Sequence, residues 1–356
     1  MSKELKLDVN QFPSLTWNHL NINRTSFDFN AGPYSIFTGD CPLLAPVSFS
    51  SEYEKIETGM GRAFDEELDQ LHSAEKEVNF FEIKESSFFE KPFLVTVDAS
   101  SLSSSLYDTV IQAGKNSVSS FIFLYKGNSE KACDIGNRIR IFADENASVK
   151  ISLVNLTGLN VNFFNSLGCL AKDNSKITYV ALELGKGKAW FSFKNLLAGY
   201  KSSFKGNIAY CATGDRFLDM NHVVIHRGKE SESEYSVDGV LGGKAKKTWR
   251  GTIDFKKGCS ASKGNEQEDV LLLDPSIVNK SLPVILCDEE DVEGRHGCTV
   301  GRIDEEKLFY LQTRGVDEKE AKELLIKGKV LAVAKLTDND EIFKMVENFV
   351  EGVDYE

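Results

Sequence analysis

The most constraining feature of this sequence is a long central stretch without proline. All seven prolines lie outside residues 93–274: Pro13, Pro33, Pro42, Pro46, Pro92, Pro275 and Pro283. Proline cannot donate a backbone hydrogen bond to a β-ladder, so a stretch that avoids it permits strands that pair on both sides. Short runs rich in β-branched and aromatic residues, such as 121–125 and 177–182, alternate there with Asn, Gly, Asp and Ser clusters. The stretch therefore predicts a long all-β region.

The order of the elements narrows the architecture further. From about residue 118 to 274 no segment repeats its apolar residues at helical spacing, so strand follows strand without crossover helices. A β-sandwich, a β-barrel, or a solenoid with roughly 20–30 residues per coil would satisfy this pattern. Turn clusters recur at irregular intervals, and no repeat consensus emerges. The residues alone leave the sandwich and the solenoid open.

Both flanks of the β region are predicted to differ from it. In residues 62–71, Phe64, Leu68 and Leu71 share one face of a helix. Beyond residue 300 the sequence predicts three helices, and Asp317 with Glu320 forms a capping box for the second of them. We expect a mixed N-terminal region, a β core and a C-terminal helical domain, at residues 1–75, 76–300 and 301–356.

Charge and targeting signals restrict the class of protein. Lys plus Arg number 42 and Asp plus Glu 54, which gives a net charge of −12. Such a chain repels phosphate backbones and anionic lipid, so we expect neither a nucleic-acid nor a membrane partner. No apolar run approaches the ~20 residues of a membrane span, and residues 1–8 lack the apolar segment of a signal peptide. Seven cysteines without any C-x-x-C pair indicate reduced thiols, and we predict a cytoplasmic protein.

Several catalytic motifs are absent or degenerate. The nearest match to a phosphate-binding P-loop, residues 238–245, has Asp238 in place of the first Gly and Ala245 in place of Ser or Thr. We read this segment as a turn between strands and reject ATP hydrolysis by this chain. No G-x-S-x-G elbow occurs, and no Ser-His-Asp set can be chosen from spacing.

Two other groups of polar residues have structural explanations. His222 and His226 alternate as on a strand, which would separate them by about 13 Å on one face, too far for one metal ion. We expect them to be hydrogen-bonded histidines. A basic group around Trp249 is predicted to form a solvated strand edge: Lys244, Lys246, Lys247 and Arg250.

The segment 284–301 carries the best candidate for metal chemistry. A strand enters an acidic turn, and His296 follows with Cys298 two residues later. If residues 295–300 form a strand, both side chains point to the same face. Imidazole and thiolate suit iron or zinc, although two ligands do not complete a site.

Residues 294–316 resemble the signature of the SufB/SufD family, in which a His-Gly-x-Thr-Val-Gly stretch runs into Asp-Glu-x-x-Leu-Phe-Tyr-Leu-x-x-Arg-Gly. Residues 235–245 are similar to the family's Gly-Val-Leu-x-Gly-Lys-Ala strand pair. Glu266-Gln267 and the Leu run at 271–273 are similar to its Gln and Leu-Leu-Leu stretch. The resemblance covers about residues 135–328.

The resemblance implies a fold and a role. The family core is a right-handed parallel β-helix between an N-terminal region and a C-terminal helical domain, which would decide between sandwich and solenoid. SufB and SufD pair with each other, each binds one SufC ATPase, and the complex assembles iron–sulfur clusters. The chain would then be a non-catalytic scaffold, with a transient cluster at the interface with SufB. Flavin has been raised as a cofactor of such complexes, but this sequence does not itself predict it.

Two departures from SufB indicate a SufD-like member. Gln267-Glu268-Asp269 lacks the Cys that follows Gln in SufB-like proteins, and Gly297 stands where they have Glu. His296 matches the SufD His that is proposed to assist cluster assembly. Cys298 replaces a residue that is usually Ala, so it is either an extra metal ligand or a small buried side chain.

The resemblance also gives the C-terminal helices a role, because this domain docks SufC in the family. The apolar candidates are Leu308, Phe309, Tyr310, Leu324, Leu325 and Ile326. They would alternatively only hold the three helices together. Two other hypotheses remain for the whole chain: a stand-alone metal-binding protein with its site near residues 288–298, and a homodimeric β-solenoid interaction protein.

Overall fold

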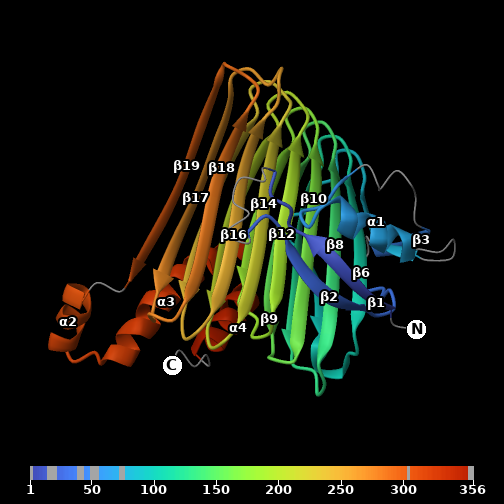
Figure 1. Cartoon of the computed structure of the whole chain (residues 1–356). Helices are drawn as coiled ribbons and strands as arrows, with labels where there is room; N and C mark the ends of the chain where they lie inside the picture. Colours follow the sequence, from blue (N-terminus) through green and yellow to red (C-terminus); the bar gives the residue numbers. More distant parts are fainter. Residues whose placement is uncertain are drawn as a thin grey trace.

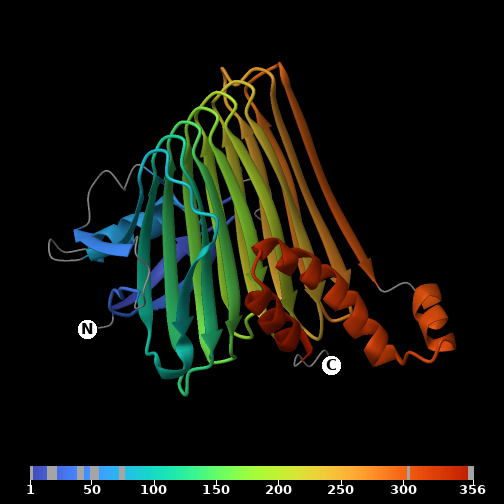
Figure 2. The ribbon, with the colours of Figure 1, turned by 180° about the vertical axis from the view of Figure 1, so that it is seen from behind.

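The computed structural model describes residues 3–13, 22–37, 44–48, 56–71, 77–302 and 305–351. Two long β-sheets face each other and are stacked from coil to coil along one axis (Figure 1). The N-terminal elements lie outside one sheet, and helices α3 and α4 lie outside the other (Figures 1 and 2). The protein is therefore mainly β, with a parallel β-solenoid at its centre.

The strands alternate between the two sheets along the chain. The nine-stranded sheet contains β3 (Leu44–Ser48), β4 (Glu77–Ile83), β6 (Ser105–Ala113), β8 (Cys133–Ala143), β10 (Val161–Ala171), β12 (Ala189–Leu197), β14 (Phe217–His226), β16 (Lys246–Phe255) and β18 (Val278–Cys287). The eight-stranded sheet contains β5 (Phe93–Asp98), β7 (Val118–Gly127), β9 (Ser148–Thr157), β11 (Lys176–Glu183), β13 (Ser203–Ala212), β15 (Glu232–Leu241), β17 (Ser262–Leu272) and β19 (Val292–Arg302).

Parallel register between successive coils confirms the solenoid and excludes the sandwich. Lys176 of β11 pairs with Ser203 of β13, 27 residues on, because 203 − 176 = 27. The same arithmetic gives 30 residues between Ser262 of β17 and Val292 of β19. Each coil therefore adds one strand to each sheet, and every interior strand is hydrogen-bonded on both sides.

One turn of each coil repeats the same backbone conformation although its sequence varies. Asn116, Asn146 and Asn174 occupy the left-handed region, with φ of 55°, 56° and 54°. The equivalent residues of the next coils, Lys201 and Glu230, do the same at φ of 53° and 55°. Asparagine tolerates this conformation best, but Lys and Glu show that the stacked coils impose it. No repeat consensus emerges from the sequence because different residues meet one geometric need.

The interior of the solenoid is filled by inward-facing apolar and aromatic side chains. Tyr179, Phe193 and Tyr235 are buried and pack edge to face, with Phe193 5.7 Å from Tyr179 and 5.5 Å from Tyr235 between ring centroids. A second apolar layer lies between the outer face of the eight-stranded sheet and the C-terminal helices, and it includes Val180 and Val346. Burial on both faces explains why these strands are so rich in apolar residues.

Proline within the sheets is confined to edge strands. Pro46 lies in β3 and Pro283 in β18, the two end strands of the nine-stranded sheet. An edge strand has one side that needs no hydrogen bond, so it tolerates the missing N–H. None of the described strands that pair on both sides contains a proline.

The N-terminal region covers part of the nine-stranded sheet. It contains an antiparallel pair, β1 (Lys3–Val9) and β2 (Thr25–Ala31), and the expected helix as α1 (Arg62–Leu71). Phe64 and Leu68 are buried, as their helical face predicts, whereas the side chain of Leu71 lies outside the described residues. Arg138 of β8 is fully buried and forms an ion pair of 2.7 Å with Asp69 of α1. Polar contacts therefore anchor α1 to the sheet.

Three C-terminal helices follow the last strand, as predicted: α2 (Glu305–Thr313), α3 (Glu318–Ala334) and α4 (Asp340–Glu351). Asp317 and Glu320 form the expected capping box at the start of α3. Helix α3 contacts β11, β13 and β15, while α2 stands away from the sheets (Figure 2). The described residues also include two short 3₁₀ turns, Ala99–Ser101 and Lys335–Thr337.

The expectation of a solvated basic edge is wrong for Lys247 and Arg250, whereas Lys244 and Lys246 are exposed as expected. Lys247, Trp249 and Arg250 are buried, at 1%, 0% and 1% exposure, and do not form a solvated edge. Strand β16 lies between β14 and β18, so it is not an edge strand. Lys247 points into the solenoid toward Glu268, whereas Arg250 points outward and forms an ion pair of 2.8 Å with Asp219.

Among the described residues, no helix is long and apolar enough to cross a membrane.

Candidate functional site

The candidate site lies where the solenoid ends, at β18 and β19. In the part of the chain that the structure describes, neither strand has a neighbour on its outer side. Their side chains are mostly half-buried or exposed, whereas those of β16 are almost all buried. The last coil therefore presents its inner face to solvent at the far end of the stack (Figure 1).

Strand register decides which side chains face into this open end. Glu266 and Glu268 of β17 are fully buried and point inward. His296 pairs with Glu266 and Cys298 with Glu268, so alternation places both β19 side chains on the same inner face. His296 and Cys298 are both exposed. The expectation that they share a face of one strand is confirmed.

Behind Cys298 lies a buried polar cluster centred on Glu268. Lys247 donates to one carboxyl oxygen of Glu268, and the Tyr210 hydroxyl donates to the same oxygen at 3.0 Å. The Cys298 thiol lies 3.6 Å from the other oxygen. Lys247 also donates to the Ser281 hydroxyl at 2.9 Å. Residues from β13, β16, β17, β18 and β19 thus meet in one network.

Burial governs the protonation of these groups. Desolvation raises the pKa of the Cys298 thiol, and the nearby Glu268 carboxylate raises it further. Desolvation likewise lowers the pKa of Lys247, although Glu268 opposes this effect. Without a metal ion or another cation, the site therefore holds Cys298 as a neutral thiol rather than as a thiolate.

A second buried carboxyl, that of Glu266, lies two residues away on β17, behind His296. The Tyr235 hydroxyl donates to one oxygen of Glu266. Desolvation raises the pKa of Glu266 to about 8, so this residue is mostly protonated at neutral pH. Its protonated form can donate a hydrogen bond as well as accept one.

The donor types at the open end suit a soft or borderline metal, but the set is incomplete. Imidazole and thiolate favour iron and zinc, and carboxylates accept both metals. Among the described residues, no group of three or more His, Cys, Asp or Glu side chains is placed to hold a metal ion. Any metal bound by His296 and Cys298 therefore needs further ligands from outside these residues.

The residues predicted to dock a partner fall into two groups. Phe309, Tyr310 and Leu324 are 67%, 57% and 54% exposed, while Leu308 and Leu325 are half-buried. Ile326 is fully buried and packs with the apolar layer against the eight-stranded sheet. We therefore leave Ile326 out of any docking surface, since its side chain holds α3 in place.

Other sequence candidates lie away from the open end. His222 and His226 both face inward and are buried. The indole of Trp249 donates to His222 Nδ1 at 3.0 Å, and burial lowers the pKa of His222 to about 3. They are neutral core histidines, as expected.

The buried carboxyls and their partners were not predicted as part of the site. Glu266, Glu268, Tyr210, Tyr235 and Lys247 lie in segments up to 58 residues apart along the chain. One signal was available, namely two glutamates at positions i and i+2 of an expected strand, which must share one face. The sequence did not show that this face points inward.

Comparison with protein families agrees with this architecture. Residues 95–329 match the family model described as "SUF system FeS cluster assembly, SufBD core domain". This match covers well over half of the chain. The protein belongs to the SufB/SufD family. The solenoid strands from β6 to β19 and most of α3 lie inside the matched region.

Individual relatives support the family. The chain is 26% identical over 212 residues to the iron–sulfur cluster assembly protein SufD of Bacillus subtilis, covering 59% of this chain and 48% of that protein. It is 30% identical over 169 residues to the SufBD family protein ycf24 of Galdieria sulphuraria, covering 47% and 76%. A ycf24 protein of Trieres chinensis is 28% identical over 235 residues, covering 62% and 47%. Against two of these three, the alignment spans about half of the relative.

Proposed function

We propose that this chain is a SufD-like, non-catalytic scaffold subunit of an iron–sulfur cluster assembly complex. In that complex it would pair with a SufB subunit, and a SufC subunit would hydrolyse ATP. The observation that carries the proposal is the open end of the solenoid, where His296 and Cys298 share one inner face. Two soft donors at an uncovered end form part of a metal site, which a second subunit can complete.

The residues of this chain at the open end would have different roles in cluster assembly. His296 is exposed and offers an imidazole nitrogen to iron in the growing cluster, which is the substrate of the assembly. Cys298 serves as a second donor once iron displaces the thiol proton. Glu268 and Lys247 hold the floor of the site in place through their buried ion pair. We assign no residue of this chain to flavin.

The stand-alone metalloprotein is the weaker alternative. It requires at least three ligands within one chain, and the described residues offer no such group. A tightly bound, stoichiometric metal in the isolated chain, lost on His296→Ala, would favour that alternative over the scaffold.

The first prediction tests the role of His296. The chain is co-expressed with SufB and SufC, and the complex is purified anaerobically. We expect His296→Ala to reduce cluster content at least fivefold, measured by iron and sulfide content, while the three subunits still co-purify. Arg295→Ala is the matched control, because Arg295 is the exposed neighbour on the opposite face of β19. Full cluster content in His296→Ala rejects the site assignment.

The second prediction tests the helical docking surface. We propose that α2, with Phe309 and Tyr310, docks the SufC subunit, together with Leu308, Leu324 and Leu325 on α2 and α3. The double variant Phe309→Ala/Tyr310→Ala should lower SufC recovery at least tenfold in a pull-down, because exposed aromatic side chains dominate such interfaces. Leu336→Ala, at an exposed apolar residue next to α3, is the control and should not change recovery.

A further inference from the structure

Two cysteines that have no part in the proposed function lie at one corner of the last coil. Cys259 is in the turn between β16 and β17, and its side chain is fully buried. Cys287 is the last residue of β18 and is exposed. The proposed cluster site uses neither of them, because His296 and Cys298 lie on β19.

Strand register brings the two cysteines close together, although they are 28 residues apart along the chain, because 287 − 259 = 28. Cys287 pairs with Phe255 of β16, and the Asp288 backbone N–H donates to the Phe255 carbonyl at 2.8 Å. Paired residues on adjacent strands lie about 5 Å apart. Cys259 follows Phe255 by four residues, in a turn that its own N–H closes by donating to the Lys256 carbonyl at 3.1 Å. The turn therefore keeps Cys259 near the ends of β16 and β18.

The two side chains also share their apolar surroundings. Cys259 packs in a small cluster with Ile253 and Phe255 of β16, and Ile285 of β18 lies against this cluster. Ile285 precedes Cys287 by two residues, so these two side chains point to the same face of β18. Burial raises the pKa of the Cys259 thiol, and the nearby Cys287 adds to this increase. The two thiols are therefore within electrostatic range of each other.

Glu289 connects the two cysteines on this side of the coil. Its carboxylate accepts from the Gly258 backbone N–H at 2.8 Å, next to Cys259. Its carbonyl oxygen accepts from the Cys287 thiol at 3.0 Å. One residue thus contacts both the turn that carries the buried cysteine and the sulfur of the exposed one.

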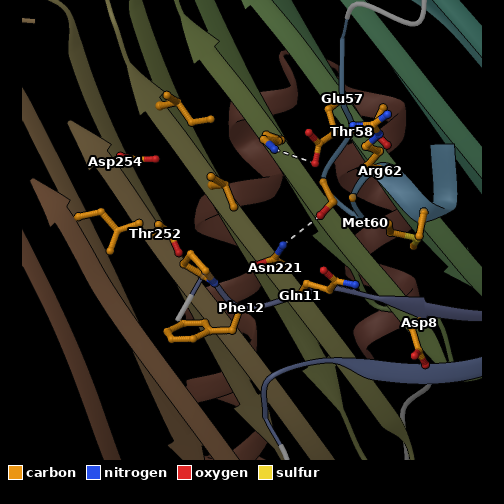
Figure 3. Close-up of a pocket in the computed structure, with 18 residues that line it drawn as sticks. Asp8, Gln11, Phe12, Glu57, Thr58, Met60, Arg62, Asn221, Thr252 and Asp254 are labelled. Carbon is orange, nitrogen blue, oxygen red and sulfur yellow. Dashed lines mark hydrogen bonds and ion pairs between the residues drawn. The ribbon is translucent and has the colours of Figure 1, made fainter. Parts of the chain in front are cut away.

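An ion-pair chain connects the same two segments on the outer face of the sheet. Lys256 of the turn pairs with Asp254 of β16 at 2.8 Å and with Asp288, the residue after Cys287, at 3.8 Å. Asp254 lies on the outer face of β16, where it lines a cavity beside the N-terminal region (Figure 3). Contacts on both faces therefore hold the end of β18 beside the turn of Cys259.

The end of β18 has the freedom that a covalent bond requires. A disulfide needs Cα atoms within about 7 Å and side chains that point toward each other. Among the described residues, β18 pairs with β16 alone, so no strand on its outer side resists a small shift of its last residues. The bond would join the last coil to the coil before it.

We propose that Cys287 and Cys259 form a reversible disulfide that fastens the end of β18 to the preceding turn. The oxidant is a low-molecular-weight disulfide, such as oxidised glutathione. The Cys287 thiolate attacks one sulfur of this disulfide, which forms a mixed disulfide and releases one small thiolate. The Cys259 thiolate then attacks the Cys287 sulfur and releases the second. The two small thiolates take up the two cysteine protons, so the protein loses two electrons and the small disulfide gains them.

The other described cysteines do not offer such a pair. Three of them are buried on strands that have neighbours on both sides: Cys133, Cys169 and Cys211. Cys298 is exposed, but its thiol contacts Glu268 in the middle of β19. Oxidation is therefore expected to begin at Cys287 and to end on Cys259.

Peptide mapping of the full chain after anaerobic treatment with oxidised glutathione tests the proposal. Trypsin places the two cysteines in separate peptides, 258–263 and 281–295, and neither peptide contains another cysteine. We expect mass spectrometry to find these two peptides linked, and dithiothreitol to release them. A link from Cys287 to any other cysteine or to a second chain overturns the proposal. A Cys287 that stays reduced or keeps its glutathione overturns it as well.

Matched variants test the order of the two steps. Cys259→Ala removes the second thiol, so the glutathione adduct on Cys287 should last at least tenfold longer than in the wild type. Cys298→Ala removes the other exposed cysteine and should leave the link unchanged. Equal adduct lifetimes in Cys259→Ala and the wild type contradict the proposal, and far-UV circular dichroism checks that each variant keeps its β structure.

Hydrogen exchange gives a second measurement that leaves the buried cysteine intact. Oxidation should slow amide exchange at the end of β18 at least fivefold in the wild type, because the bond holds this end to the turn. Cys287→Ala changes an exposed residue and should show no such slowing. The same exchange rates in oxidised and reduced wild type mean that the bond does not fasten β18.

Discussion

Glu266 and Glu268 lie two residues apart on the inner face of β17, and they have different polar neighbours. Glu268 contacts the ammonium of Lys247 and the hydroxyl of Tyr210. Glu266 accepts from the hydroxyl of Tyr235 and has no cationic partner among the described residues, and burial raises its pKa to about 8. Desolvation therefore keeps the Glu266 carboxyl protonated at neutral pH.

The raised pKa of Glu266 predicts a pH-dependent stability. The folded chain holds this proton up to about pH 8, whereas an unfolded glutamate releases it near pH 4.5. The folded state therefore binds more protons between these values, and the free energy of unfolding falls as the pH rises through them. The loss is on the order of a few kcal/mol.

Urea unfolding at several pH values between 5.5 and 8.5 measures this effect. We expect Glu266→Gln to flatten the pH dependence, because glutamine mimics the protonated carboxyl. Glu232→Gln on β15 removes an exposed carboxyl and should leave the slope as in the wild type. If both variants keep the wild-type slope, Glu266 is not the residue that titrates.

Among single elements, helix α3 has one face that packs inside the chain and another that is exposed. Its buried side chains, Ile326 and Val330, face the eight-stranded sheet, and Leu324 is exposed. The three neighbouring residues Leu324, Leu325 and Ile326 therefore have three different environments. Helical geometry turns each residue by about 100° from the last, so adjacent apolar residues cannot all face one partner.

Stability measurements on α3 test this division. Ile326→Ala leaves a hole between the helix and the sheet, so we expect the free energy of unfolding to fall by about 2–4 kcal/mol. Leu324→Ala removes an exposed side chain and should change it by less than about 0.5 kcal/mol. Urea denaturation followed by circular dichroism measures both. A large loss in Leu324→Ala would mean that this residue packs inside the chain.

The whole molecule is a stack of coils whose last coil is uncovered among the described residues. Interior coils are covered by neighbours, whereas β18 and β19 have no further strand beside them among the described residues. Solenoids need a terminal cap, because an exposed last coil offers both an edge and apolar surface to other chains. Val300, on the inner face of β19, is 47% exposed there.

The open end predicts that the isolated chain associates with itself as its concentration rises. We expect Val300→Lys to weaken this association at least fivefold in sedimentation equilibrium, because it places a charge on the uncovered inner face. Leu159→Lys is the control, since Leu159 is 68% exposed and lies in the turn between β9 and β10. A wild-type chain that stays monomeric at all concentrations contradicts the prediction.

The all-β centre, the helix at 62–71 and the three C-terminal helices could all be predicted from the amino-acid sequence. These features depend on local chemistry: proline is excluded from strands paired on both sides, and apolar spacing defines a helical face. The placement of His296 and Cys298 on one face also followed, because strand alternation needs no tertiary knowledge.

Which face of each strand points inward became known from the folded chain alone. Lys247 and Trp249 look like a solvated edge in sequence, yet stacking of the coils buries them, with Lys247 against Glu268. The same stacking joins Cys298 to Glu268 across two strands. The register between parallel strands about 30 residues apart cannot be predicted from the local sequence of either strand. The partner of a buried charge can therefore be identified only from the stacked coils.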